Sequence, residues 1–332
     1  MTGGAGFIGS ELVRQLSNQG TRVVVVDNLV NGKRENLEGM PGDLVELVVA
    51  DIRDNDLMVD LMRRVDIVFH LACLGVRHSI HSPIENHEVN ATATLSLLMI
   101  ARKAGIKRFI HVSSSEVYGT AIHVPMTEEH PTFPMTVYGA AKLAGESYAR
   151  AFHRTYGFPV VIVRPFNTYG RHCHHEGDSG EVIPKFLLRS MAGRQLIIFG
   201  DGTQTRDFLH VSDTARGILL AGAADNAIGQ TINLGSGNEI TIADLAHEVM
   251  AVTGRQDIPV SHDAPRPGDT LRLYADIGKA HNILGFQPLV VLREGLESLK
   301  RWYMSLEQTP EVLLEREVVH NWESGGIDAN GA

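Results

Sequence analysis

The stretch Thr2-Gly3-Gly4-Ala5-Gly6-Phe7-Ile8-Gly9-Ser10 (TGGAGFIGS) decides the fold class. Its glycines fit two overlapping patterns, G-x-G-x-x-G and G-x-x-G-x-x-G, which both end at Gly9. Glycines let a backbone turn sharply and approach a pyrophosphate, and a helix that starts near Ser10 would offer that anion its free N–H groups and positive dipole end. Taken alone, the loop also fits a glycine-rich turn without a ligand.

A carboxylate at the end of the next apolar run adds a second signal. Thr21–Asp27 (TRVVVVD) ends 18 residues after Gly9, close to the spacing of about 20 expected for a ribose-binding acid. Because a carboxylate accepts a hydrogen bond from a ribose 2′-hydroxyl and repels a 2′-phosphate, Asp27 favours NAD over NADP. Asp51-Ile52, after the following apolar run, suits an adenine contact, and Asp51 fits equally well as a helix cap.

Apolar runs alternate with segments of helical period, which is typical of a parallel sheet covered on both faces. We predict strands at 21–27, 44–50, 66–71, 108–113 and 159–164. We predict helices at 10–19, 55–64, 85–104, 137–156, 182–192, 211–224, 242–253 and 289–306. The expected fold class is therefore α/β, a doubly wound parallel sheet with a smaller α/β substrate domain. We expect the dinucleotide-binding domain at 1–166 plus about 206–232, the substrate domain at 167–205 and 233–306, and a loosely attached tail at 307–332.

The position of the glycine loop is unusual, because such a loop normally follows a strand and here it begins at Thr2. The first, central strand of the sheet is missing from the chain. We expect Met1 to occupy the last position of that strand, and hypothesise that the native protein begins several residues upstream. An intact mass that begins at Met1 would refute this hypothesis.

Composition limits the class of protein. The 332 residues carry a net charge of −9, which argues against general nucleic-acid binding, because phosphate backbones need a basic face. The two cysteines cannot form a disulfide framework. No run approaches the about 20 apolar residues of a membrane span, and the glycine-rich N-terminus is unlike a signal peptide, so we expect a cytoplasmic protein without a membrane partner.

Tyr138 and Lys142 stand four residues apart on one face of a predicted helix. A nearby cation lowers the pKa of a phenol, and a phenolate can take a proton from a sugar hydroxyl while hydride leaves the same carbon for NAD. The segment Ser113–Gly119 (SSSEVYG) closes a predicted strand at the carboxyl edge of the sheet, where ligands bind in such folds. A serine hydroxyl there could share the substrate's proton with Tyr138.

With these motifs in order, the chain resembles the extended short-chain dehydrogenase/reductases of the NAD-dependent nucleotide-sugar epimerase/dehydratase family, which have a Rossmann fold. The resemblance runs from Thr2 to about Trp302 and rests on TGGAGFIGS, DNLVNGKRENL, ADIRD, FHLAC, SSSEVYG, YGAAK, RPFNTYG, GDGTQTRDFLHVSD, NLGSGN and RPGD. It implies a catalytic set of Ser114, Tyr138 and Lys142. It implies a cofactor site of Gly3, Gly6, Phe7, Ile8, Asp27, Asn28, Asp51, Ile52, Leu71 and Ala72, with Tyr138 and Lys142. It implies that Asn167, Arg206 and Arg266 bind the substrate diphosphate, and that the protein is a homodimer through the helices at 85–104 and 137–156.

Glu116 favours one reaction within that family. Resemblance to the 4,6-dehydratases implies that this carboxylate removes the C5 proton of a nucleoside-diphosphate hexose oxidised at C4, and that the 6-hydroxyl then leaves as water. We also include Ser115 among the catalytic candidates; it precedes Glu116 where dehydratases of dTDP-glucose usually have an Asp that serves as the acid. Gly75-Val76-Arg77 with Ser79 is instead similar to UDP-glucuronate epimerases, which makes Arg77 a candidate substrate ligand.

We therefore favour a 4,6-dehydratase and keep three alternatives. These are a 4-epimerase of the UDP-glucose or UDP-glucuronate type, a UDP-glucuronate decarboxylase, and a binding protein without cofactor. A loop with His172, His174, His175, Glu176 and Asp178 could hold zinc. We assign no metal, because the chemistry above needs none.

Overall fold

The computed structural model describes residues 1–177 and 179–322. Its main sheet is parallel, with the strand order β2-β1-β3-β4-β5-β10 once Thr2, which bridges β1 and β3, is included. The strands are β1 (Val23–Asp27), β2 (Val45–Val49), β3 (Ile67–His70), β4 (Arg108–Val112), β5 (Val160–Pro165) and β10 (Thr231–Leu234). This confirms the doubly wound class, and all five predicted strands are present. Strand β10, which pairs with β5, was not predicted.

Met1 and Thr2 stand in the position of the missing central strand. The Thr2 N–H donates to the Phe69 carbonyl at 3.0 Å, and the Gly3 N–H donates to the Val26 carbonyl at 2.8 Å. The Met1 amino group donates to the Val24 carbonyl at 2.6 Å, and burial lowers its pKa from 8.0 to about 5. The last two positions of the strand are therefore occupied, as expected for Met1, and the buried amino group favours its neutral form.

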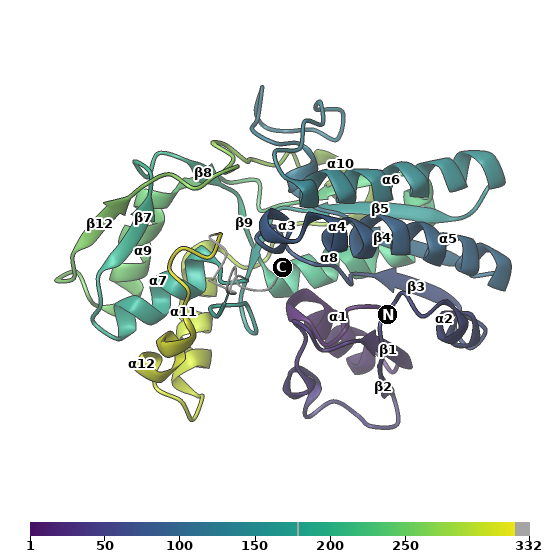
Figure 1. The fold of residues 1–332 in the computed structure, drawn as a ribbon, viewed down its shortest axis with the longest axis horizontal. Helices are drawn as coiled ribbons and strands as arrows, with labels where there is room; N and C mark the ends of the chain where they lie inside the picture. The colour runs from purple at the N-terminus through teal and green to yellow at the C-terminus, as the bar shows by residue number, and fades with distance from the viewer. Residues whose placement is uncertain (178, 323–332) are drawn as a thin grey trace, which may run out of the picture.

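Helices cover both faces of this sheet, as Figure 1 shows. On one face α1 (Phe7–Asn18), α8 (Val211–Ala223) and α10 (Gly278–Leu284) bury Leu12, Ile218 and their apolar neighbours against the strands. On the other face lie α2 (Asn55–Met62), α4 (Pro83–His87), a π-helical turn at Glu88–Thr92, α5 (Ala93–Ala104) and α6 (Val137–Tyr156). The predicted helix at 85–104 is therefore present as three consecutive helical pieces, α4, the π-helical turn and α5.

Short segments complete this part of the chain. They are the 3-10 turns at Arg34–Leu37, Ser115–Val117 and Asp225–Ala227, and α3 (His78–His81). Among the described residues, no helix is both long and apolar enough to cross a lipid bilayer.

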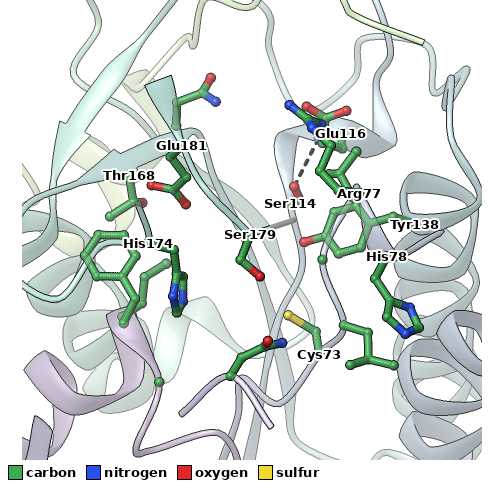
Figure 2. A pocket seen from close by; sticks show the side chains of 18 of the residues that line it. Cys73, Arg77, His78, Ser114, Glu116, Tyr138, Thr168, His174, Ser179 and Glu181 are labelled. Atoms are coloured by element: carbon green, nitrogen blue, oxygen red, sulfur yellow. Dashed lines mark hydrogen bonds between the residues drawn. The ribbon is translucent and has the colours of Figure 1, made fainter. Parts of the chain in front are cut away.

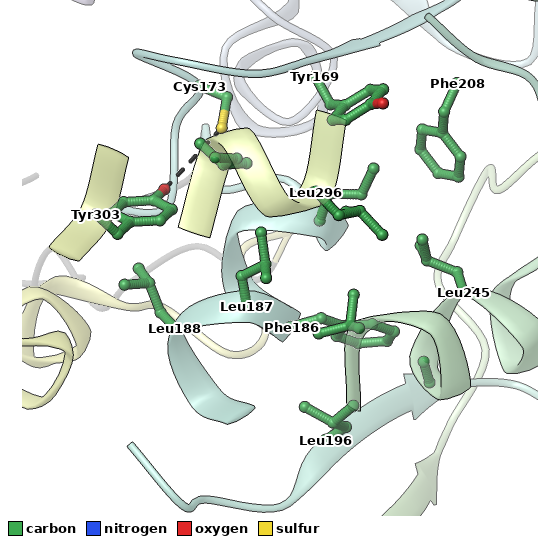
Figure 3. Close-up of a cluster of buried hydrophobic side chains, with 14 of the residues drawn as sticks. Tyr169, Cys173, Phe186, Leu187, Leu188, Leu196, Phe208, Leu245, Leu296 and Tyr303 are labelled. Atoms are coloured by element: carbon green, nitrogen blue, oxygen red, sulfur yellow. Dashed lines mark hydrogen bonds between the residues drawn. The ribbon is translucent and has the colours of Figure 1, made fainter. Parts of the chain in front are cut away.

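A second, smaller layer of strands and helices lies beside the carboxyl edge of the main sheet (Figure 1). Its strand pairs are β7 (Leu196–Phe199) with β12 (Val260–Asp263), β6 (Asn167–Tyr169) with β9 (Phe208–His210), and β8 (Thr205–Arg206) with β11 (Ile240–Thr241). Its helices are α7 (Val182–Met191), α9 (Ile242–Thr253), α11 (Leu292–Met304) and α12 (Pro310–Leu313), followed by a 3-10 turn at Leu314–Arg316. Figure 3 shows their shared core, in which Phe186, Leu187, Leu245 and Leu296 are buried.

Residues 307–322 pack against this second layer and are not the loosely attached tail that the sequence predicted. Leu313 and Leu314 are buried in its core, and Glu317 forms an ion pair with Arg189 at 2.9 Å. A polar sequence did not reveal this attachment, because it depends on two leucines and one buried charge pair. The rest of the predicted tail, 323–332, lies outside the described residues.

Candidate active site

A single cavity of about 810 Å³ at the carboxyl edge of the main sheet brings the predicted site residues together. Its lining includes Gly3, Gly6, Phe7, Ile8, Asp27, Asn28, Asp51, Ile52, Leu71, Ala72, Arg77, Ser114, Ser115, Glu116, Tyr138, Lys142, Asn167, Arg206 and Arg266. These residues come from segments as far apart as 3 and 266 in the chain. The fold therefore gathers the whole predicted set around one space.

The glycine loop provides a cradle in the backbone at the start of α1. Gly6 is the N-cap residue and no side chain caps the helix, so the first N–H groups of α1 have no intrahelical partner. A Cβ on Gly9 would lie 2.0 Å from the Gly3 carbonyl oxygen, and one on Gly3 would lie 2.6 Å from the Ala72 nitrogen. The loop can therefore close this tightly only with glycine, and the free N–H groups fit a pyrophosphate.

Asp27 is held firmly at the end of β1. Its two carboxylate oxygens accept hydrogen bonds from the backbone N–H groups of Ala5 at 3.0 Å and Leu29 at 2.9 Å. Since a carboxylate has about four acceptor positions, the others remain for a ribose hydroxyl on the cavity side. The loop and Asp27 together fit the pyrophosphate and ribose of NAD.

The sequence left two interpretations of Asp51, an adenine contact and a helix cap. In the structure Asp51 does not cap a helix. It forms an ion pair with Arg53 at 2.8 Å, and hydrogen bonds from Arg53 hold the pKa of its carboxyl group below the usual range. The Asn28 amide also donates to it at 3.2 Å. Asp54 caps α2 instead, by accepting from the Leu57 N–H at 3.1 Å.

Helix α6 carries the predicted catalytic phenol and ammonium. Its bounds equal the predicted ones, because Thr136 accepts from the Gly139 N–H at 3.2 Å at one end and Gly157 adopts a left-handed conformation with φ of 63° at the other. Tyr138 and Lys142 lie one turn apart and are both buried. The helix therefore presents both groups to the cavity from a well-defined start.

The segment after β4 lies directly against the first turn of α6. A Cβ on Gly139 would be 2.6 Å from the Glu116 carbonyl oxygen, so only glycine allows this approach. Ser114 caps the 3-10 turn at Ser115–Val117 by accepting from the Glu116 N–H at 3.2 Å. Figure 2 shows Ser114, Glu116 and Tyr138 on the same wall of the cavity.

The expected lowering of the Tyr138 pKa by Lys142 is not found. Burial raises the pKa of the Tyr138 phenol well above 10, Cys73 and Glu116 raise it further, and a hydrogen bond with Ser114 opposes them. Lys142 donates instead to the Val112 carbonyl oxygen at 2.6 Å, and burial lowers its own pKa. The physical reason is desolvation of both groups, which disfavours the phenolate and the ammonium alike.

Three arginines converge on the other end of the cavity. Arg206 forms an ion pair with Asp269, whereas the Nε atoms of Arg77 and Arg266 are buried without a hydrogen-bond partner among the described residues. Burial and the neighbouring arginines lower the pKa of Arg266 to about 9. The buried Asn167 Oδ1 also lacks a partner there. An anion with several oxygens would satisfy these groups, and a diphosphate has that chemistry.

The structure adds cavity residues that sequence reasoning missed. Glu181 lines the cavity directly before α7, and Cys73 is exposed to it beside Tyr138 (Figure 2). For Glu181 a signal existed, since a lone acid precedes the apolar run of a predicted helix. Its position across the cavity could not be derived from that signal.

The histidine-rich loop contacts the cofactor side of the cavity. His172 exchanges a hydrogen bond with the Ser10 hydroxyl at 3.2 Å, and Glu176 forms an ion pair with Lys33. Asp178 lies outside the described residues. Among residues 1–177 and 179–322, no cluster of three or more His, Cys, Asp or Glu side chains has an arrangement suited to a metal ion.

Comparison with known proteins agrees with this geometry. A profile of the "NAD dependent epimerase/dehydratase family" matches residues 1–235. The chain is 36% identical to a putative UDP-glucose 4-epimerase of Methanocaldococcus jannaschii, over 93% of this chain and 99% of that protein. It is 37% identical to a dTDP-glucose 4,6-dehydratase of Streptomyces niveus, over 91% of each chain. A crystal structure of DesIV, a dTDP-glucose 4,6-dehydratase from Streptomyces venezuelae with NAD bound, superimposes with a TM-score of 0.85 at 37% identity, over 91% of this chain and 95% of that one.

The chain therefore belongs to the NAD-dependent epimerase/dehydratase family. It is an NAD-dependent enzyme whose relatives act on nucleotide sugars. These relatives include 4-epimerases, 4,6-dehydratases and UDP-glucuronic acid decarboxylases, so membership alone does not select the reaction.

Proposed function

We propose that the protein is a nucleotide-sugar 4,6-dehydratase in which Glu116 removes the C5 proton of a nucleoside-diphosphate hexose. One observation carries this proposal: a carboxylate lies in the same cavity as Tyr138, on a segment packed against the first turn of α6. A 4-epimerase needs no such base, because its reaction breaks no bond at C5.

The surroundings of Glu116 suit a base. Burial raises the pKa of its carboxyl group, whereas Arg206 and Arg77 oppose that rise and favour the anion. A carboxylate of raised pKa is a stronger base than one in water, and the two arginines favour its ionised form.

The reaction follows from the order of groups along the cavity. Ser114 and Tyr138 take the proton of the sugar 4-hydroxyl, and Lys142 lies one helical turn further on. A bound NAD would supply the hydride chemistry at C4 and C6, and the positive charge of its nicotinamide would lower the raised pKa of Tyr138. Once C4 is a ketone, the C5 proton is acidic and Glu116 removes it while the 6-hydroxyl departs. Arg77, Arg206 and Arg266, with Asn167, would hold the diphosphate at the far end.

A panel of sugar nucleotides tests this proposal. The purified protein is incubated in D₂O with dTDP-glucose, UDP-glucose, UDP-N-acetylglucosamine, GDP-mannose and UDP-glucuronate, and the products are analysed by mass spectrometry. We expect one substrate to lose a single water and to gain deuterium at C5. Glu116→Gln should abolish both changes, whereas Glu297→Gln, a half-exposed carboxylate on α11, should abolish neither.

The 4-epimerase remains the second candidate, because the M. jannaschii relative named above is a putative enzyme of that kind. A product of unchanged mass with inverted configuration at C4, and no deuterium at C5, would establish it and exclude the dehydratase. Loss of carbon dioxide from UDP-glucuronate would establish a decarboxylase instead.

A further inference from the structure

Loss of a hydroxyl group needs a proton donor, because hydroxide is a poor leaving group. This requirement rests on the dehydratase proposed above. Ser115, the residue next to Glu116, is 3% exposed and ends in a hydroxyl, which is too weak an acid for this task. An acid must therefore come from elsewhere in the cavity.

Glu181 is the carboxyl group that projects into the cavity from the opposite wall. Figure 2 shows its side chain on the side of Thr168 and His174, across the cavity from Ser114, Glu116 and Tyr138. Its backbone is fixed, because its N–H donates to the His174 carbonyl at 2.9 Å and its carbonyl accepts from the Lys185 N–H. The carboxyl group is thus presented by a rigid helix start.

The Glu181 side chain has no other structural task that the described residues reveal. It stands at the N-cap position of α7 yet does not cap that helix. No side chain or N–H group of the described residues hydrogen-bonds to its carboxyl group. Its side chain is half-buried in the cavity lining, and an acid of raised pKa in a cavity is characteristic of functional sites.

The charges around the two glutamates differ in a way that separates their roles. Burial and the Asp269 carboxylate raise the pKa of Glu116, and two arginines, Arg206 and Arg77, oppose that rise. Glu181 is near Arg77 alone and also near the carboxylate of Glu176, and burial raises its pKa to about 8. Glu181 is therefore mostly protonated at neutral pH. Two carboxyl groups with environments that push them apart form an acid and base pair.

We propose that Glu181 is the general acid that protonates the departing 6-hydroxyl group of the sugar. In this step the C5–H bond breaks and its proton goes to Glu116, while its electron pair forms the C5–C6 double bond. The C6–O bond breaks, its electron pair leaves with oxygen, and the Glu181 proton completes a water molecule. Two protons are removed from the sugar, one from the 4-hydroxyl group and one from C5. Two protons are consumed, one by the departing hydroxyl group and one in the final protonation of C5, so the number of protons is conserved.

The test separates oxidation at C4, proton removal at C5 and loss of water. Glu181→Gln, of nearly the same shape, is mixed with the sugar nucleotide from the panel that the unmodified protein dehydrates. Reduced-nicotinamide absorbance should appear within a few fold of the normal rate, and recovered sugar should contain deuterium at C5. Release of water should slow by about 10²- to 10⁴-fold, the usual contribution of a general acid.

Glu116→Gln provides the contrasting pattern, with reduced nicotinamide but no deuterium at C5. Water release within threefold of normal in Glu181→Gln would overturn the inference. Loss of the nicotinamide signal in that variant would also overturn it, since Glu181 would then act in binding or folding. If the unmodified protein releases no water from any sugar of the panel, the proposed function fails first and the inference with it.

Discussion

Replacement of Arg164 by methionine should destabilise the helix that carries the catalytic residues. Arg164 on β5 is 2% exposed, and its guanidinium donates to both carboxylate oxygens of Glu146 at 2.8 and 2.7 Å and to the Tyr118 hydroxyl at 2.7 Å. Glu146 is fully buried on α6, two turns after Tyr138. Arg164→Met leaves this carboxylate with Arg150 as its remaining cation.

The expected magnitude follows from the buried charge that the substitution leaves behind. Breaking one partner of a buried pair costs about 3–5 kcal/mol, and because Arg150 still contacts Glu146 we expect the lower end, about 3 kcal/mol. That value raises the unfolded fraction by about 10²-fold. Urea titration of the cofactor-free protein, followed by circular dichroism, measures the change in the free energy of unfolding.

The double variant Glu146→Gln/Arg164→Met is the matched control. It removes both charges, so it should be more stable than the sum of the two single losses predicts, by about 1–3 kcal/mol. A single Arg164→Met loss below about 1 kcal/mol, or strict additivity in the double variant, would refute the assignment of a coupled buried pair.

Three further outcomes follow from the cofactor side of the cavity and the chain start. Gly9→Ala should abolish NAD binding measured by calorimetry, because its Cβ would lie 2.0 Å from the Gly3 carbonyl oxygen; unchanged affinity would contradict the cradle. Lys33→Ala should accelerate NAD release several-fold in a stopped-flow chase, because its ion pair to Glu176 joins the segment after Gly32 to the loop that carries His174, and Gly32 and His174 both line the cavity. Glu176→Ala should give no further increase in the Lys33→Ala background. In protein produced with Met1 as its first residue, the Met1 amino group has a pKa lowered from 8.0 to about 5. Between these values it is neutral in the folded and charged in the unfolded protein, so stability should rise by up to about 4 kcal/mol as pH increases from 5 to 8. Nα-acetylation should remove this pH dependence; a slope that persists after acetylation would assign it to other groups.

Local signals explain which elements the sequence predicts well. Helix α6 has its predicted bounds because a threonine cap and a left-handed glycine are encoded at its own ends. Helix α1 begins at Phe7, three residues before the prediction, because Gly6 is the cap although glycine is a poor helix former. Strand β10 was missed because its four residues acquire their strand conformation by pairing with β5, far away in sequence.

The candidate site likewise contains residues that local motifs predict and properties that they do not. Tyr138, Lys142 and the glycine loop are found from motifs, since short spacing and backbone chemistry fix their roles. The pKa of Tyr138 and the position of Glu181 depend on burial and on which walls face each other. Those properties arise only when separate segments of the chain come together, and no local pattern encodes them.

In the described residues, a two-residue bridge at Met1 and Thr2 joins one piece of the sheet, β1 and β2, to another, β3, β4, β5 and β10. Among the described residues, backbone hydrogen bonds between β1 and β3 run only through this bridge, and the remaining attachment of the β1–β2 piece includes the packing of α1 on α8. Asp27 belongs to one piece and Tyr138 to the other. A dinucleotide that reaches from Asp27 to Tyr138 therefore acts as a cross-link within the fold. Its loss would loosen β1 and β2 before the rest of the sheet, as amide hydrogen exchange would reveal.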